Sequence, residues 1–331
     1  MNEIETLYND AKKILLSNIP SYWPEMYSLA YEYTNRDMLP EIITPAAACK
    51  SVGGKMGATN EIGAAILAAA ISMRILDDLQ DNDKPEALYN KIGLPRTLNY
   101  VDAFRTLAYK ILGDKCLEDE NYLIILQEFT SCYLVVLAGQ DSDLKPAQLN
   151  FEEAWKIIEM KTGFIHATAA AIGAIAGTSD TVFVNACKNY GYHLGLAIQI
   201  FNDIDGIWNP EGVSDIEQNK ITLPIIYALN CEHKDKKALF NIVSNNSLAI
   251  NSAQVLKILN DTNTKEYLLW AALQQREKAF EAISILPDNE GTQIMRAFFD
   301  SIFGDIEELT AGTAGENDAH ILSSFIKQAH V

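Results

Sequence analysis

The feature that most constrains the fold is a run of three aspartates at the end of a long apolar segment. Asp77, Asp78 and Asp81 follow an Ala-, Ile- and Leu-rich stretch that begins near residue 60, and this composition predicts a buried helix. Residues four apart share a helix face, so Asp77 and Asp81 lie together and Asp78 flanks them. Clustered carboxylates repel one another and are costly to desolvate, and a bound cation removes both costs. The run predicts a Mg2+ site open to phosphate oxygens, although an acidic helix end entering a loop explains this motif alone equally well.

A second polar stripe lies more than a hundred residues further along the chain. Gln199, Asn202 and Asp203 fall on one side of another predicted helix. Lys161 precedes this stripe in a polar segment, and Lys220 follows it in another. Metals held by carboxylates, with lysines opposite, form a receptor for a diphosphate. The two stripes together therefore favour diphosphate chemistry over a solvated acidic surface.

Five motifs in a fixed order make the chain similar to the trans-isoprenyl diphosphate synthases, the polyprenyl synthetase family. The similarity extends over roughly residues 30 to 235, and the rest of the chain resembles the family only in being helical. No single motif is specific, but five in order are. The motifs are DDxxD at 77–81, GQxxDL at 139–144, KTG at 161–163, QIxxDD at 199–203 with Asn202 in place of its first Asp, and KxTLP at 220–224.

This resemblance implies an all-α, isoprenoid-synthase-type helical bundle around a deep central cavity, with the two acidic motifs on facing helices. It implies three Mg2+ ions, two of them held by Asp77, Asp78 and Asp81 and the third by Asn202 and Asp203. Ionisation of an allylic diphosphate needs charge stabilisation on the leaving pyrophosphate, which metals and lysines supply.

The resemblance also implies which residues contact the substrate. Ser72 and Met73 lie just before the first acidic motif and are candidate walls of the prenyl pocket, although ordinary core packing explains them equally well. Their size suggests, by analogy with the family, an allylic prenyl diphosphate of C10–C20 as the donor. The implied diphosphate contacts are the catalytic residues Lys161, Thr162 and Gln199, together with Lys220.

Three departures from the family concern isopentenyl diphosphate, the usual acceptor. Leu39 stands at the second basic position of the GKxLRP segment, although Arg36 can replace the first. Ala70 stands where the family carries a histidine, and the Arg-Arg pair after DDxxD is reduced to Lys84. A diphosphate without several fixed cations is poorly held. We therefore expect that the allylic site survives and that the isopentenyl diphosphate site does not.

The expected function is transfer of the prenyl group to another acceptor. The chain is similar to the ComQ-type pheromone-modifying prenyltransferases, which act on a Trp of a small peptide. The likeness lies in a DDLxDxD run at 77–83, in the Asn202-Asp203 pair, and in the segment 214–220. The resemblance thus implies a Mg2+-dependent prenyltransferase with a Trp-containing peptide as a partner.

Other functions stay open. A terpene synthase or cyclase on the same scaffold is disfavoured because Gly206 and Pro210 interrupt its Asn-Ser-Glu pattern. A divergent chain-elongating prenyl diphosphate synthase would keep isopentenyl diphosphate as acceptor. A regulatory subunit need not keep a complete DDxxD motif, which argues against that role. Asp205, Glu211 or neither completes the second metal motif, and Asp205 would need an altered helix register.

Composition limits the partners. The chain has 26 basic and 44 acidic residues, a net charge of -18, which argues against nucleic acid and against an anionic membrane surface. The five cysteines have no paired spacing, which indicates a reduced, cytoplasmic setting. The apolar runs are short or interrupted, so we expect no membrane span. We also expect a homodimer.

Periodic apolar positions recur along nearly the whole chain, and strand-like alternation is almost absent. We expect a single domain over residues 1–331, in which 310–331 form a flexible connector and a last helix. Pro and Gly residues mark the breaks. The predicted helices span 3–17, 21–34, 41–51, 60–80, 96–112, 119–138, 151–176, 180–207, 222–230, 234–244, 251–259, 263–285, 289–308 and 318–329.

Overall fold

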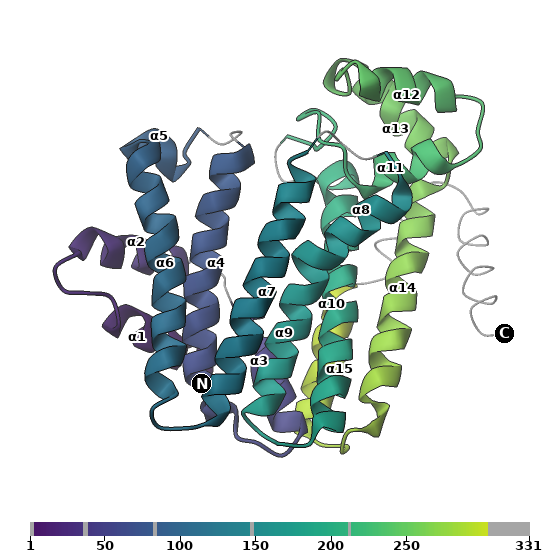
Figure 1. The fold of residues 1–331 in the computed structure, drawn as a ribbon. Coiled ribbons are helices and arrows are strands. Elements are labelled where there is room, and N and C mark those ends of the chain that lie inside the picture. Colours follow the sequence, from purple (N-terminus) through teal and green to yellow (C-terminus); the bar gives the residue numbers. More distant parts are fainter. Residues whose placement is uncertain (1–2, 36–38, 82–84, 146–148, 211–212, 304–331) are drawn as a thin grey trace. The chain divides into compact units, whose positions relative to one another are not determined.

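The computed structural model describes residues 3–35, 39–81, 85–145, 149–210 and 213–303. Within these residues the chain forms helices and turns and no strand (Figure 1). The chain divides into two compact units, which are interleaved along the sequence. Unit 1 comprises Met1–Tyr133, Thr168–Lys188 and Ile285–Met295, and unit 2 comprises Leu134–Ala167, Asn189–Ser284 and Arg296–Val331. The prediction of a single domain over 1–331 stays a prediction.

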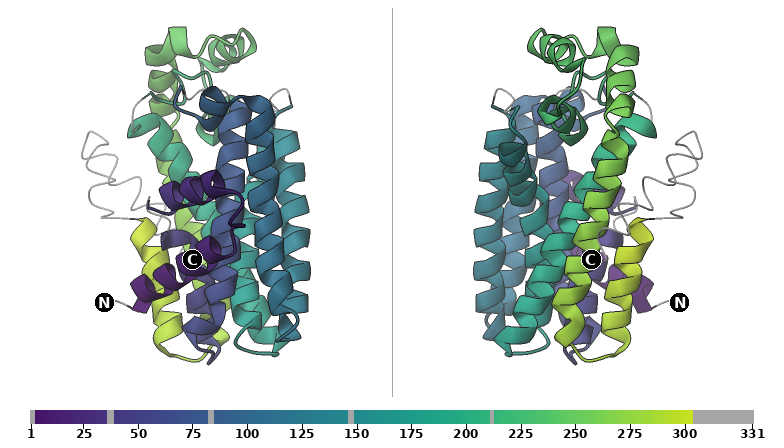
Figure 2. Two further views of the ribbon diagram at one scale, coloured as in Figure 1. Left: turned by 90° about the vertical axis from the view of Figure 1, so that its left-hand side faces the viewer. Right: turned by 90° about the vertical axis from the view of Figure 1, so that its right-hand side faces the viewer.

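Unit 1 is organised around the apolar helix that carries the three aspartates. This helix, α4, spans Asn60–Asp81, and α6 (Leu94–Lys115) runs beside it (Figure 1). Alanines and Gly63 fill the buried face of α4, so its neighbours can approach closely. Figure 2 shows α1 and α2 lying across α4 rather than alongside it. The other helices that begin in its first segment, Met1–Tyr133, are α1 (Glu3–Ser17), α2 (Pro24–Thr34), α3 (Leu39–Ser51), the short η1 (Met56–Thr59), α5 (Leu88–Ile92) and α7 (Asn121–Asp143).

Unit 2 has its own apolar core, which helices from 189 onward build together. Ile207 from α10 (Thr181–Trp208) packs with Ile225 from α11 (Leu223–Asn230). Leu239 and Val255 are fully buried in the same cluster, and each contributes about 1.5–3 kcal/mol by leaving water. The other elements of this part of the chain are α8 (Phe151–Ile158), η2 (Glu159–Gly163), α9 (Phe164–Ile175), α12 (Lys236–Ser244), η3 (Ala249–Asn251), α13 (Ser252–Asp261), α14 (Thr264–Ala282), η4 (Ile283–Ile285) and α15 (Glu290–Ile302).

The helices agree in place with the sequence prediction over most of the described chain, with three differences. The predicted helix over 151–176 is helical through residue 175, but a π-helical turn, Glu159–Gly163, divides it into α8 and α9. The short helix α5 was not predicted, because five residues give too little periodicity to detect. The helix predicted over 41–51 begins earlier, at Leu39, so Pro40 lies in the first turn of α3, where its missing N–H costs nothing. The predicted helix over 318–329 lies outside the described residues.

One described helix, α7, is long and apolar enough to cross a membrane by length and composition. A single helix of this kind is weak evidence, because the core helix of a soluble protein has the same composition. All five cysteines are free thiols. The expected absence of a membrane span and the expected cytoplasmic setting stay predictions.

Candidate active site

Lys161 and Thr162 lie in the π-helical turn η2 of unit 2. A π-turn inserts a residue into a helix and changes the direction of the side chains that follow, and such turns are frequent at functional sites. The turn is held by close packing against α10. A Cβ atom added to Gly195 would overlap the carbonyl oxygen of Thr162 and would lie only 3.0 Å from its carbonyl carbon. Only glycine fits there without a shift, so the sequence of α10 sets the position of the π-turn.

A chain of hydrogen bonds connects three of the sequence motifs in unit 2. The hydroxyl of Thr162 donates to Oε1 of Gln199 at 2.9 Å, and Nε2 of Gln199 donates to Oδ1 of Asp203 at 2.8 Å. The backbone N–H of Leu223 donates to Oδ2 of Asp203 at 3.1 Å. The KTG, QIxxDD and KxTLP motifs therefore meet at one buried carboxylate, as their polar character in the sequence suggested.

Asp203 is 6% exposed, and burial raises its pKa to about 7. The hydrogen bonds from Gln199 and from the Leu223 amide oppose this rise in the pKa, and the negative charges of Asp215 and Asp143 add to it. A carboxylate in this setting is stabilised by a divalent cation, which offsets both the desolvation and the repulsion. The surroundings of Asp203 therefore fit a metal ligand.

Asp143 and Asp215 are acidic residues near Asp203 that the sequence analysis did not assign. Asp143 is the aspartate of the GQxxDL motif and forms an ion pair with Lys161. The carboxylate of Asp215 lies against Gly206, where an added Cβ would come 2.8 Å from its Cγ atom. The N–H of Asp215 donates to the carbonyl of Gly206 at 2.9 Å. The N–H of Lys220 donates in turn to the carbonyl of Asp215 at 2.9 Å. In the sequence, the only indication that Asp215 belongs to the site was its position shortly before Lys220.

The other members of the second motif lie elsewhere on α10. Asn202 is exposed, whereas its neighbour Asp203 is buried, because consecutive residues of a helix point in different directions. Asp205 is also exposed, and its carboxylate accepts a hydrogen bond from Asn209 at 3.3 Å. Lys220 is half-buried and follows Asn219, which adopts a left-handed backbone conformation with a φ of 58°. Glu211 lies outside the described residues.

The first acidic motif lies at the C-terminal end of α4 in unit 1. Asp77 and Asp81 are exposed, four residues apart, and Asp78 is half-buried. In the described chain no group of three acidic, His or Cys side chains is close enough to hold a metal ion. Mg2+ needs only one or two carboxylates when phosphate oxygens and water complete its shell. The donor chemistry of both acidic motifs therefore fits Mg2+, with a bound diphosphate as part of the site.

Asp78 also lines a cavity of about 240 Å³ in unit 1. Three acidic residues, Glu32, Asp78 and Glu86, line this cavity together with one basic residue, Lys91. The segments that form it lie just before the GKxLRP-like segment and just after DDxxD. The complete lining is Leu29, Glu32, Tyr33, Asp78, Glu86, Ala87, Leu88 and Lys91.

Ser72 and Met73, the candidate walls of the prenyl pocket, differ in their environments. Ser72 is fully buried, and its hydroxyl donates to the carbonyl of Val101 at 2.8 Å. The hydroxyl of Tyr133 lies 3.4 Å from the same atom. Ser72 thus joins α4 to α6 and α7 inside unit 1, which favours its interpretation as a core residue. Met73 is half-buried.

Comparison with known proteins decides the family. A profile described as polyprenyl synthetase matches residues 36–261, about two thirds of the chain. The chain belongs to the polyprenyl synthetase family. The geranylgeranyl diphosphate synthase of Sulfolobus acidocaldarius is 26% identical over 280 residues, covering 77% of this chain and 84% of that protein. Tryptophan prenyltransferase ComQ of Bacillus subtilis is 25% identical over 224 residues, covering 67% of this chain and 71% of ComQ.

Solved structures confirm the fold of this polyprenyl synthetase. Geranylgeranyl pyrophosphate synthetase from Pyrococcus horikoshii matches with a TM-score of 0.80 at 21% identity, covering 92% of this chain and 99% of that one. A polyprenyl synthase from Caulobacter crescentus, complexed with calcium and isoprenyl diphosphate, matches with a TM-score of 0.79 at 19% identity, covering 90% and 94%. The predicted all-α isoprenoid synthase fold and the predicted family are therefore confirmed. The match to ComQ is weaker than the match to the geranylgeranyl diphosphate synthase, so the acceptor stays a matter for proposal.

Proposed function

We propose that this polyprenyl synthetase is a Mg2+-dependent prenyltransferase that ionises an allylic prenyl diphosphate of C10–C20 and transfers the prenyl group to an acceptor other than isopentenyl diphosphate, a Trp of a peptide. The family supports the first half of this proposal. The acidic cavity beside Asp78 carries the second half.

On the donor side, the proposal assigns each residue one task. Thr162 and Gln199 orient the diphosphate from a hydrogen-bonded chain that is fixed at Asp203. Lys161 and Lys220 neutralise phosphate oxygens, and the ion pair with Asp143 sets the position of the Lys161 ammonium group. Asp77, Asp78 and Asp81 would hold Mg2+, as would Asp203, with Asn202 beside it in the motif. When bound, Mg2+ neutralises charge on the departing pyrophosphate.

On the acceptor side, charge argues against a second diphosphate. Besides Asp78, which the proposal assigns to Mg2+, the titratable residues of the described lining are Glu32, Glu86 and one basic residue, Lys91, so this part of the chain offers isopentenyl diphosphate no cluster of fixed cations. Two unit charges 4 Å apart interact with about 1 kcal/mol in bulk water and about 4 kcal/mol near a protein surface. The two glutamates of the described lining therefore oppose the binding of a diphosphate, and Lys91 alone supports it. The relative ComQ, a tryptophan prenyltransferase, supports a Trp side chain as the acceptor.

Chain elongation is a second candidate, because several relatives are named as prenyl diphosphate synthases. In that case the repulsion in the cavity beside Asp78 would have to be overcome by cations bound there. A terpene synthase activity would give a cyclic product or a terpene alcohol without any acceptor.

The test is a product analysis with Mg2+ and geranyl, farnesyl or geranylgeranyl diphosphate. Each donor is offered alone, with isopentenyl diphosphate, or with a short Trp-containing peptide. We expect prenylated peptide and pyrophosphate release that does not depend on isopentenyl diphosphate. Elongated diphosphates formed at the rate of an ordinary synthase would refute the acceptor assignment, and a cyclic hydrocarbon from the donor alone would replace it with a terpene synthase.

A further inference from the structure

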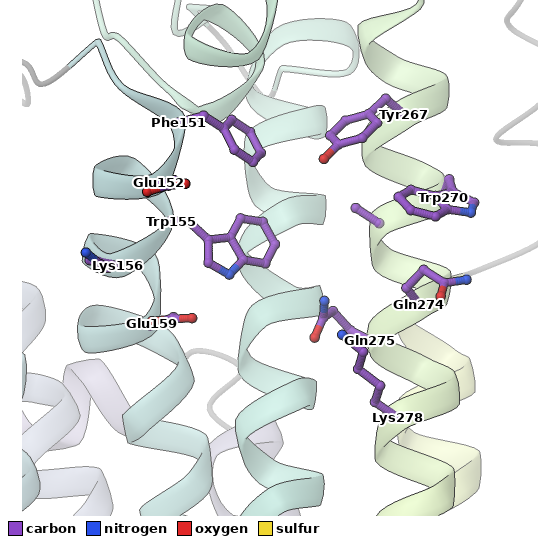
Figure 3. Close-up of a pocket in the computed structure, with 11 residues that line it drawn as sticks. Phe151, Glu152, Trp155, Lys156, Glu159, Tyr267, Trp270, Gln274, Gln275 and Lys278 are labelled. Carbon is purple, nitrogen blue, oxygen red and sulfur yellow. The ribbon is translucent and has the colours of Figure 1, made fainter. Parts of the chain in front are cut away.

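A groove of about 530 Å³ lies between α8 and α14 of unit 2, away from the hydrogen-bonded chain at Asp203. This volume is within the range of about 300–1,000 Å³ typical of ligand sites. Figure 3 shows Phe151 and Trp155 of α8 and Glu159 of η2 pointing toward α14, and Tyr267 and Gln275 pointing back. The groove is lined by Phe151, Glu152, Trp155, Lys156, Glu159, Tyr267, Trp270, Ala271, Gln274, Gln275 and Lys278.

The upper part of the groove is a connected set of aromatic rings. Phe151 stacks on Trp155, with ring centroids 6.0 Å apart and planes 27° apart, and makes an edge contact with Tyr267 at 6.2 Å. Tyr267 in turn stacks on Tyr227 at 4.0 Å and 12°. Trp155 and Tyr267 are half-buried, so each ring still has surface facing the groove. Stacked supports hold these two rings in place, so a flat apolar group can bind there with little loss of conformational entropy.

The lower part of the groove carries one acceptor and one donor, both held from behind by α10. The carboxylate of Glu159 lies near the hydroxyl of Tyr192, and burial together with this carboxylate raises the pKa of that hydroxyl. Nδ1 of His193 and Oε1 of Gln275 lie 2.8 Å apart, and because an amide oxygen can only accept, the Nδ1–H group of His193 donates to it. The amide N–H groups of Gln275 are then the donors available to a ligand. A carboxylate and an amide beside aromatic rings match an indole N–H and a peptide carbonyl.

We propose that this groove, the α8–α14 groove, is the docking site for the acceptor peptide, which it recognises through a tryptophan side chain. The inference rests on the proposed function for its choice of ligand. The indole ring lies against Trp155 and Tyr267, its N–H donates to Glu159, and the peptide backbone accepts from Gln275. Glu159 lies two residues before Lys161, so the bound peptide contacts the same π-turn that carries a diphosphate ligand.

Charge favours a basic peptide over an acidic one. Glu152 and Glu159 line the groove, whereas Lys156 points away from it and Lys278 lies at its lower end (Figure 3). The net charge of -18 attracts a cationic peptide at long range. The probe is therefore a short synthetic peptide with one central Trp between lysines, and the same peptide with Ala in place of Trp is its matched control.

Binding is measured first without any allylic diphosphate, so that it does not depend on catalysis. We expect the Trp peptide to bind, the Ala peptide to bind at least about tenfold more weakly, and Trp155→Ala to lose at least about tenfold in affinity for the Trp peptide. Trp155→Phe, which keeps a ring, should recover most of that loss, and Glu159→Gln should weaken binding of the Trp peptide severalfold. Phe240→Ala removes an aromatic side chain that is 50% exposed on α12, and this control should leave binding and prenyl transfer unchanged.

A photoreactive benzoylphenylalanine in place of the peptide Trp locates the site. Crosslinks to α8 or α14 support the inference, and crosslinks only elsewhere, or no crosslinking at millimolar peptide, overturn it. Displacement of the peptide by farnesol would show that the groove holds the prenyl chain instead, and would overturn it too. If the peptide binds and crosslinks here but is not prenylated, the docking site stands and the proposed function fails. If the peptide is prenylated while Trp155→Ala, folded and of unchanged melting temperature, keeps full affinity, the proposed function stands and the docking site fails.

Discussion

Replacing Gly195 by alanine is the sharpest perturbation of the π-turn that carries Lys161 and Thr162. The added Cβ would lie 3.0 Å from the carbonyl carbon of Thr162 and 3.1 Å from the Cα of Gly163, both backbone atoms. Carbon atoms in van der Waals contact are about 3.5–4.0 Å apart, so η2 must move by about 0.5–1 Å. A displacement of about 1 Å at a catalytic group can cost about a hundredfold in rate. We therefore expect Gly195→Ala to lower the rate of pyrophosphate release by about one to two orders of magnitude.

The same substitution has opposing effects on stability. Overpacking costs about 1–3 kcal/mol, and alanine in place of glycine in a helix returns about 1 kcal/mol. We expect a small net loss, visible as a melting temperature a few degrees lower. Gly113→Ala is the matched control, because this glycine also lies in a helix, α6, but has nothing within 4 Å of its added Cβ. That control should raise the melting temperature slightly and leave the rate unchanged.

Pyrophosphate release from an allylic diphosphate with Mg2+ measures the rate, and thermal unfolding measures the stability. A Gly195→Ala protein within twofold of the wild-type rate would refute the claim that packing of α10 on η2 positions Lys161 and Thr162. Equal losses of rate in Gly195→Ala and Gly113→Ala would refute it as well, since the effect would then be general to helix glycines.

Three further predictions follow from other parts of the molecule. Gln199→Leu removes the hydrogen-bond partner of the Thr162 hydroxyl and of Oδ1 of Asp203, which costs about 1–3 kcal/mol of folding stability. Both the melting temperature and the rate of pyrophosphate release should fall. An unchanged rate would show that Gln199 is not part of the site. Burial lowers the pKa of His166 from 6.5 to about 4. Between pH 6.5 and 4 the unfolded chain therefore binds more protons than the folded one, and the stability of the folded protein falls as the pH is lowered. The melting temperature of His166→Gln should fall less than that of wild type over this range, and identical pH profiles would contradict the prediction. The helix α7 exposes the apolar side chains of Leu123, Ile124 and Leu134, the last of which is 70% exposed, and such a surface fits the expected homodimer. In analytical ultracentrifugation we expect wild type to sediment as a dimer and Leu134→Asp as a monomer. A wild-type monomer would disprove the expectation.

The helical framework and the acidic motifs could be predicted because their signals are local. The stretch before Asp77 is apolar throughout, and the spacing of Asp77 and Asp81 places both on one face of any regular helix. Asp203 was assigned as a metal ligand from its place in a motif, and the structure adds the burial and the hydrogen bonds that hold it. In these cases a single segment of sequence contained the information.

What could not be predicted depends on residues far apart in the chain. The π-turn at Lys161 follows from the contact with Gly195, and nothing in the segment 159–163 itself departs from an ordinary helix pattern. Asp215 reaches the vicinity of Asp203 because a loop folds back on Gly206. The α8–α14 groove joins Trp155 to Tyr267, more than a hundred residues away, and each aromatic alone predicts only a core position.

The central claim is that the enzyme holds an allylic diphosphate through Mg2+ and has no place for a second diphosphate. Titration calorimetry with a non-reactive thio-analogue of farnesyl diphosphate tests it most directly. We predict that the analogue binds only with Mg2+ and that Asp81→Asn and Asp203→Asn abolish this binding. We also predict that the analogue complex does not bind isopentenyl diphosphate at millimolar concentration. Analogue binding without metal, or micromolar binding of isopentenyl diphosphate to the analogue complex, would contradict the claim.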